Sequence, residues 1–254
     1  MIPFLKKLLQ LLASFIPEDV RIWLVAKRKG ISFRDEKRQR VQRQKYWDFH
    51  IKNHEMLMLS IANYAFVNRP IDGYYLEFGC CSAVTMRLAW DNFHWIFPSW
   101  KFVAFDSFEG FPDIQEIDRQ EIWQKGKSSM DEGKFIDCLA DHGVPREKFQ
   151  TVKGFYDTTL TPELQRKLLP TKAAVVYVDC DLYASTVPVL EFIIPLLQKG
   201  TVIVFDEWNA FWGDPQKGER RAFHEFQAKN PSWNFEPFVS TNMAQSFICV
   251  PKQQ

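Results

Sequence analysis

The sequence has no long apolar run, little surplus charge of either sign and few cysteines. Although 46% of its 254 residues are hydrophobic, no segment reaches the eighteen or so consecutive apolar residues that a membrane-spanning helix needs. The 32 basic and 31 acidic residues leave a net charge of +1, so a polyanionic partner would have to meet a local basic patch. The five cysteines show no disulfide framework, which favours a reducing, cytoplasmic setting. This composition excludes disorder, collagen-like repetition and a small disulfide scaffold.

The first seventy residues are expected to be helical. Apolar residues recur at helical spacing over residues 4–16, 19–29 and 46–66, with an almost wholly charged segment over residues 36–43. Lysines interrupt the apolar start of the chain and no small-residue cleavage site follows, so we expect no removed signal peptide. The helices are predicted to end at Asn68-Arg69-Pro70. We therefore divide the chain into a helical region, residues 1–70, and a second domain, residues 71–254.

The pattern changes after Gly73. Short apolar runs over residues 74–78, 101–105, 173–178 and 200–205 alternate with helix-length segments, which is typical of βαβ units and a mostly parallel sheet. Two further runs, residues 234–239 and 246–250, leave no room for a helix between them. We expect an α/β fold that closes with an antiparallel hairpin.

The turn after the first predicted strand points to a ligand with a cationic group. In a doubly wound sheet the ligand lies outside the carboxyl ends of the strands. Glu77 ends this strand and Gly79 opens the turn, where a glycine lets the backbone approach a bound molecule closely. Ala83 stands where a dinucleotide motif has its third glycine, and Glu77 would repel a phosphate but suit an amine. An ordinary strand-to-helix turn is the alternative.

Asp106, at the end of the next strand, supports the ligand hypothesis. An acid at this place accepts hydrogen bonds from ribose hydroxyls. An amine beside Glu77 and a ribose beside Asp106 together describe a nucleoside joined to an amino acid. This is S-adenosylmethionine rather than NAD.

Four acids follow the two later strands: Asp179, Asp181, Asp206 and Glu207. The 27 residues that separate the first and third of them accommodate one crossover helix and a parallel strand. We therefore expect these carboxylates to converge at one edge, where like charges raise one another's pKa unless a cation intervenes. An all-oxygen set favours Mg²⁺, with Ca²⁺ and Mn²⁺ as alternatives. The competing interpretation is that the acids cap helices and pair with Lys217, Arg220 or Arg221.

Together these motifs resemble the macrocin O-methyltransferase family, over roughly residues 73–250. The resemblance rests on Glu77-x-Gly79 and four further strings, which are Asp106-Ser107-Phe108-Glu109-Gly110-Phe111-Pro112, Gly154-Phe155-Tyr156-Asp157-Thr158, Asp179-x-Asp181-Leu182-Tyr183-x-Ser185-Thr186 and Asp206-Glu207. Members of the family are class I, S-adenosylmethionine-dependent and Mg²⁺-dependent enzymes that methylate hydroxyls of sugars and natural products. The resemblance implies a Rossmann-like, seven-stranded, mostly parallel sheet in residues 71–254.

The resemblance also implies roles for individual residues. The cofactor set is Glu77, Gly79, Ser82, Asp106, Ser107, Phe108 and Asp157, with the first two at the methionine end and Asp106 at the ribose. The metal set is Asp179, Asp206 and Glu207. Related enzymes usually have two aspartates at the last strand, and Glu207 is one methylene longer. The more distant catechol enzymes use a lysine base that this sequence lacks, so Asp179 is the predicted catalytic base.

The sequence therefore predicts an O-methyltransferase for a sugar, glycan or glycosylated natural product. The alternatives are a methyltransferase for nucleic acid or for a phenol, and a non-catalytic module of the same fold. Against nucleic acid stand the balanced charge and the absence of an Asn/Asp-Pro-Pro-Tyr-type motif.

The remaining features bear on partners. His54 and His224 share no metal-ligand spacing with the other histidines. For His224 the alternatives are a catalytic base and a packed or surface residue, and we expect the second. Trp208, Phe211 and Trp212 follow the predicted metal ligands and are expected either to line the acceptor site or to pack in the core. The N-terminal helix and the basic residues 21–45 either contact an anionic inner membrane surface or pack on the chain or across a homo-oligomer.

Overall fold

The computed structural model describes residues 16–252. The chain divides into two compact units, Met1–Lys52 and Asn53–Gln254, and the division falls inside the long helix α3 (Phe33–Val67). The helix expected over residues 4–16 lies almost wholly outside the described residues. The domain boundary expected at residues 70–71 stays a prediction.

The first unit contains α2 (Glu18–Lys29) and the start of α3. Helix α2 ends at Gly30, whose φ of 67° lies in the left-handed region that glycine adopts readily. Glu36 on α3 is buried and is held by ion pairs with Lys29, Arg40 and Arg43, at 2.8, 3.2 and 3.0 Å. Trp23, Leu24 and other large apolar side chains of this unit remain exposed.

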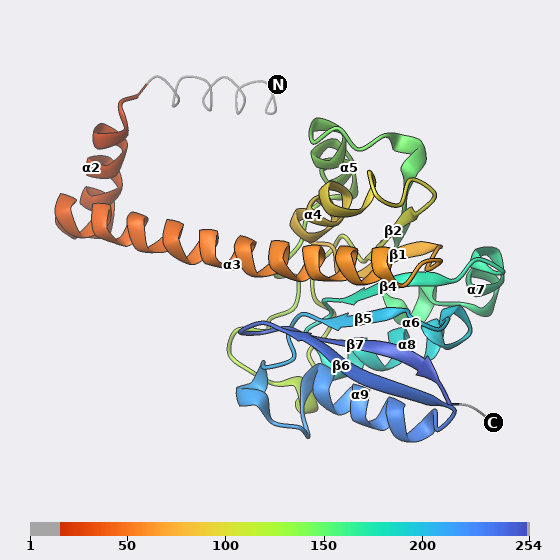
Figure 1. The fold of residues 1–254 in the computed structure, drawn as a ribbon. Coiled ribbons are helices and arrows are strands. Elements are labelled where there is room, and N and C mark those ends of the chain that lie inside the picture. The colour runs from red at the N-terminus through yellow and green to blue at the C-terminus, as the bar shows by residue number, and fades with distance from the viewer. Residues whose placement is uncertain (1–15, 253–254) are drawn as a thin grey trace. The chain divides into compact units, whose positions relative to one another are not determined.

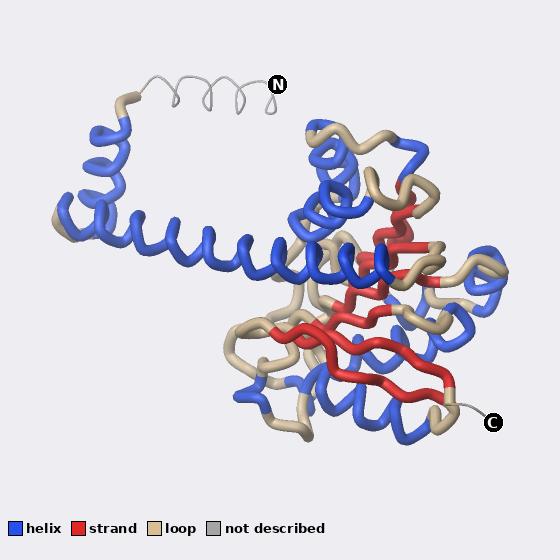
Figure 2. Tube along the Cα trace, viewed as in Figure 1, coloured by secondary structure: helices blue, strands red, loops and turns tan. Residues whose placement is uncertain are grey.

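The second unit is built on a seven-stranded sheet in the order β3-β2-β1-β4-β5-β7-β6 (Figures 1 and 2). The strands are β1 (Tyr74–Phe78), β2 (Lys101–Asp106), β3 (Phe149–Lys153), β4 (Ala173–Val178), β5 (Val202–Phe205), β6 (Trp233–Ser240) and β7 (Gln245–Pro251). Strands β1 to β5 pair in parallel, and β7 is antiparallel to both of its neighbours. The seven-stranded, mostly parallel sheet with a closing antiparallel hairpin is confirmed.

Helices cover both faces of this sheet (Figure 2). They are α4 (Val84–Phe93), α5 (Glu132–Asp141), α6 (Tyr156–Thr159), α7 (Pro162–Leu168), α8 (Tyr183–Ile193) and α9 (Gly218–Lys229). Because successive strand residues point to opposite faces, Tyr75 and Tyr177 join the core formed with α3, α4 and α5. Leu76 and Val176 join the core formed with α8 and α9.

Three features differ from the expectations. Residues 36–43 and 46–66 form one continuous helix, α3, rather than separate segments. Strand β3 was not anticipated, since it lies at the sheet edge and only one of its five residues is fully buried. The crossover helix, for which the sequence pattern predicts residues 186–198, begins at Tyr183 instead. The buried carboxylate of Asp118 accepts hydrogen bonds there from the backbone N–H groups of Tyr183 and Ala184, at 2.7 and 3.0 Å. Among the described helices, none is both long and apolar enough to cross a membrane.

Candidate active site

The carboxyl edge of the sheet is where the chain concentrates backbone strain. The strand order reverses between the neighbouring strands β1 and β4. Doubly wound sheets bind ligands at such a point, outside the carboxyl ends of the strands. Non-glycine residues with positive φ are uncommon and gather at functional sites. All seven such residues in the described chain lie in loops that follow β1, β2, β4 or β5: Cys81, Ala83, Phe108, Ser128, Asp181, Phe211 and Trp212.

The turn after β1 begins at Gly79, and its geometry demands glycine. Its φ is 90°, and a Cβ atom there would lie 1.9 Å from the carbonyl oxygen of Asp179. The close approach that the structure shows is therefore between the ends of β1 and β4. Contact of Gly79 with a cofactor stays a prediction. Ala83 adopts a φ of 60° at the N-terminus of α4.

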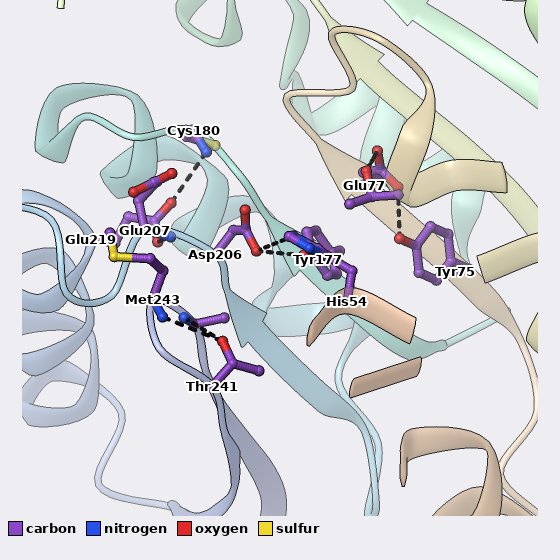
Figure 3. A network of polar contacts seen from close by, with 12 residues as sticks. His54, Tyr75, Glu77, Tyr177, Cys180, Asp206, Glu207, Glu219, Thr241 and Met243 are labelled. Atoms are coloured by element: carbon purple, nitrogen blue, oxygen red, sulfur yellow. Dashed lines mark hydrogen bonds and ion pairs between the residues drawn. The ribbon is translucent and has the colours of Figure 1, made fainter. Parts of the chain in front are cut away.

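Glu77 is fully buried directly beneath this turn. Its carboxylate accepts hydrogen bonds from the hydroxyl of Tyr75 at 2.6 Å and the hydroxyl of Thr85 at 2.7 Å (Figure 3). Burial raises the pKa of Glu77 to about 7, the two hydrogen bonds oppose that rise, and the charges of Asp206 and Asp106 add to it. An acid at this position would be stabilised in its ionised form by a cationic group of a bound ligand.

Asp106 links the turn after β1 to the turn after β2. One carboxylate oxygen accepts from the backbone N–H groups of Cys80 at 2.7 Å and Cys81 at 3.0 Å, and the other accepts from Phe108 N–H at 2.6 Å. A carboxylate has about four acceptor positions, so Oδ1 keeps one for a further donor such as a ribose hydroxyl. Asp106 is thus held rigidly at the end of β2, and its contact with a ribose stays a prediction.

The other predicted cofactor residues have local roles in the structure. Ser107 donates to the carbonyl of Gly110 at 2.9 Å, which closes the turn after β2. Phe108 is buried edge-on against Phe135, with ring centroids 5.4 Å apart. Ser82 and Asp157 are exposed. Cofactor contacts of these four residues stay predictions.

Three acids converge after β4 and β5. Ligand atoms of Asp179, Asp181 and Glu207 all lie within 4.8 Å of one another. The three side chains are partly exposed yet surrounded by protein, and desolvation is the largest cause of the raised pKa of each, followed by repulsion from neighbouring acids. For Glu207 the pKa rises to about 7. Asp181 was noted in the sequence but not assigned to the metal set, and its place in the cluster is a new observation.

Asp206 points to different partners. Its Oδ1 accepts from the hydroxyl of Tyr177 at 2.6 Å and lies 2.9 Å from Nε2 of His54 (Figure 3). His54 is buried on α3, and no spacing in the sequence linked it to Asp206, 152 residues away. A metal-binding role for Asp206 stays a prediction.

Glu219, at the start of α9, was not anticipated either. It is buried, and its two carboxylate oxygens accept from the backbone N–H groups of Cys180 at 3.2 Å and Glu207 at 3.1 Å (Figure 3). The three aromatic residues after β5, which were expected either to line the acceptor site or to pack in the core, differ in burial. Trp208 and Phe211 are buried, whereas Trp212 is 90% exposed.

These residues fit an S-adenosylmethionine site and a hard-cation site. At the β1 end lies a buried acid that has no cationic partner among the described residues, and at the β2 end lies a fixed carboxylate with a remaining acceptor position. Three carboxylates whose pKa values are raised first by burial and then by neighbouring acids offer only oxygen ligands, which suit Mg²⁺ or Mn²⁺. Fold and site together define a class I methyltransferase.

Sequence comparison identifies the family. The model of the macrocin O-methyltransferase (TylF) family matches residues 67–232, and the chain belongs to this family. It is therefore an O-methyltransferase, with S-adenosylmethionine as methyl donor. A search of curated proteins found no match.

Solved structures confirm the fold. The calicheamicin methyltransferase CalS11 has a TM-score of 0.64 and 20% identity, and the match covers 93% of this chain and 95% of that one. The O-methyltransferase NovP has a TM-score of 0.61 and 17% identity, with 78% and 80% of the two chains covered. An apo structure of CalS11, described as a TDP-rhamnose 3′-O-methyltransferase, has a TM-score of 0.56 at 20% identity, with 76% and 78% covered.

Proposed function

We propose that this chain methylates a hydroxyl of a sugar or glycosylated natural product and requires a divalent cation, most simply Mg²⁺. The observation that carries the proposal is the cluster of Asp179, Asp181 and Glu207, which follow the carboxyl ends of β4 and β5. Three carboxylates this close are unfavourable together without a counter-charge. Family membership and the TDP-rhamnose substrate of CalS11 support a sugar as acceptor.

The chemistry follows from the placement of these groups. A bound hard cation lowers the pKa of a hydroxyl and fixes its direction. Glu77 and Asp106 would bind the amine and the ribose of the methyl donor, and methyl transfer would need the acceptor hydroxyl in line with the bond from sulfur to the methyl carbon. As the hydroxyl oxygen forms its bond to that carbon, the carbon–sulfur bond breaks and S-adenosylhomocysteine leaves. Asp179, the predicted base, would accept the hydroxyl proton.

Radiolabelled methyl transfer tests this function. Sugar nucleotides, glycolipids and phenols are each offered to EDTA-treated enzyme, with and without added Mg²⁺. We expect label in a sugar hydroxyl only when Mg²⁺ is present. Full turnover in EDTA would overturn the metal requirement, and labelling of phenols alone would overturn the acceptor class. A salt-dependent gel shift with nucleic acid would favour the alternative acceptor instead.

A further inference from the structure

The first turn of α9 anchors several loops of the site. Lys217, just before the helix, donates to the carbonyl of Ile117 at 3.0 Å, in the loop after β2. A Cβ at Gly218 would meet the ring of Phe211 at 2.8 Å, so the helix start packs directly on the loop after β5. Arg220 donates to the carbonyl of Gly213 in the same loop.

Glu219 occupies the centre of this turn and contacts two loops at once. Its carboxylate accepts from the backbone N–H groups of Cys180 and Glu207. Cys180 stands between two acids of the cluster in the sequence, and Glu207 is the third acid. A single carboxylate thus accepts from backbone groups of both loops that supply the cluster. Hydrogen bonds with a charged acceptor are stronger than neutral ones.

The burial of Glu219 is costly and calls for a reason. It is 1% exposed, and burial and repulsion from Asp181, Glu207 and Asp206 all raise its pKa. An apolar residue would fill the same space without that cost, but it would leave two backbone N–H groups unpaired. The two bonds, rather than packing, account for an acid at this position.

We propose that Glu219 is a positioning residue, which holds the loops after β4 and β5 at the separation that the cluster needs to bind a divalent cation. This rests on the proposed function, since it concerns the same cation site. Glu219 is not itself a ligand in this proposal, because its carboxylate oxygens accept from backbone N–H groups of the two loops. It fixes where those ligand atoms stand, as outer groups around metal sites do.

Two variants and a matched control test this role. Glu219→Gln keeps the size but presents an NH₂ group to one of the two N–H donors, and Glu219→Ala removes both acceptors. Glu191→Gln is the control, because it makes the same carboxyl-to-amide change at an exposed position on α8, 3.7 Å from Lys229. The probes are Mn²⁺ alone, measured by electron paramagnetic resonance, and S-adenosylhomocysteine, measured by calorimetry.

We expect Glu219→Gln to weaken Mn²⁺ binding about tenfold and Glu219→Ala by ten- to a hundredfold, with S-adenosylhomocysteine affinity within about twofold of the native value. In the cation-free protein, NMR should show faster hydrogen exchange at the amides of Cys180 and Glu207 in both variants. The control should match the native chain in every measurement.

A role in packing alone predicts that the isosteric glutamine variant behaves as the native chain, and that result would overturn the proposal. So would unchanged exchange at both amides, a measurement that needs no cation. If the native protein binds no Mn²⁺, the proposed function fails, while the exchange of the two amides still decides whether Glu219 holds the loops. If Glu219→Ala fails to fold, the glutamine variant decides both points.

Discussion

Replacement of Glu77 by glutamine should remove a pH-dependent loss of stability. The carboxyl is buried between Tyr75 and Thr85, and its pKa rises from 4.5 to about 7, chiefly through desolvation. Below pH 4.5 it is neutral in both folded and unfolded chains, so it brings no penalty. As pH rises, the unfolded chain loses the proton first, and stability falls until pH passes the folded pKa near 7.

The size of this effect follows from the two pKa values. A rise from 4.5 to about 7 corresponds to about 3 kcal/mol of lost unfolding free energy at pH 8 relative to pH 4.5. Glutamine does not ionise, so the variant should gain about that amount on the native chain between these pH values. Any pH-independent cost of fitting an amide between the two hydroxyls cancels in this comparison.

Urea unfolding in EDTA, without methyl donor, measures the effect between pH 4.5 and 8. Other acids of the site also titrate, but the difference between native and Glu77→Gln chains isolates this carboxyl. Glu236→Gln, at an exposed position on β6, is the control and should show no pH-dependent difference. The reasoning is refuted if the native and Glu77→Gln curves stay parallel across this range, or if the variant loses relative stability as pH rises.

Three further perturbations test other parts of the account. Gly79→Ala places a Cβ 1.9 Å from the Asp179 carbonyl oxygen, so urea unfolding should show a loss of at least about 2 kcal/mol; a loss below about 0.5 kcal/mol would contradict it. Trp212→Ala should raise the KM for the acceptor severalfold and leave the free energy of unfolding within about 0.5 kcal/mol of the native value. The control Trp95→Ala, at another highly exposed tryptophan, should leave that KM unchanged; the same KM for native and Trp212→Ala enzymes would exclude Trp212 from acceptor binding. The half-exposed Trp23 lies among eleven basic and five acidic residues over residues 16–52, so Trp23→Ala should weaken co-sedimentation with anionic vesicles; no native binding to such vesicles would remove the membrane hypothesis.

The sheet could be predicted because its central strands are buried on both faces. Such strands appear as continuous apolar runs, as β4 does over residues 173–178. Strand β3 gave no such signal, since Gln150 and Lys153 at this edge are exposed. The start of α8 depends on Asp118, which accepts from the N–H of Tyr183 and precedes it by 65 residues. Local sequence patterns do not show a contact of this range.

The candidate site was predictable only where strand ends determine it. Asp179 and Glu207 follow neighbouring parallel strands, so their convergence follows from topology alone. His54 and Glu219 reach the same region from helices, and neither has a spacing relation to the residues that it contacts. Side-chain contacts of this kind depend on how helices pack, which hydrophobic periodicity does not specify.

Crystals soaked with Mn²⁺ provide the most direct test of the cation site. Anomalous diffraction locates the ion without any assumption about activity. We expect one peak about 2.2 Å from a carboxylate oxygen of each of Asp179, Asp181 and Glu207. Density for these side chains with no anomalous peak among them, at Mn²⁺ concentrations that support turnover, would contradict the account.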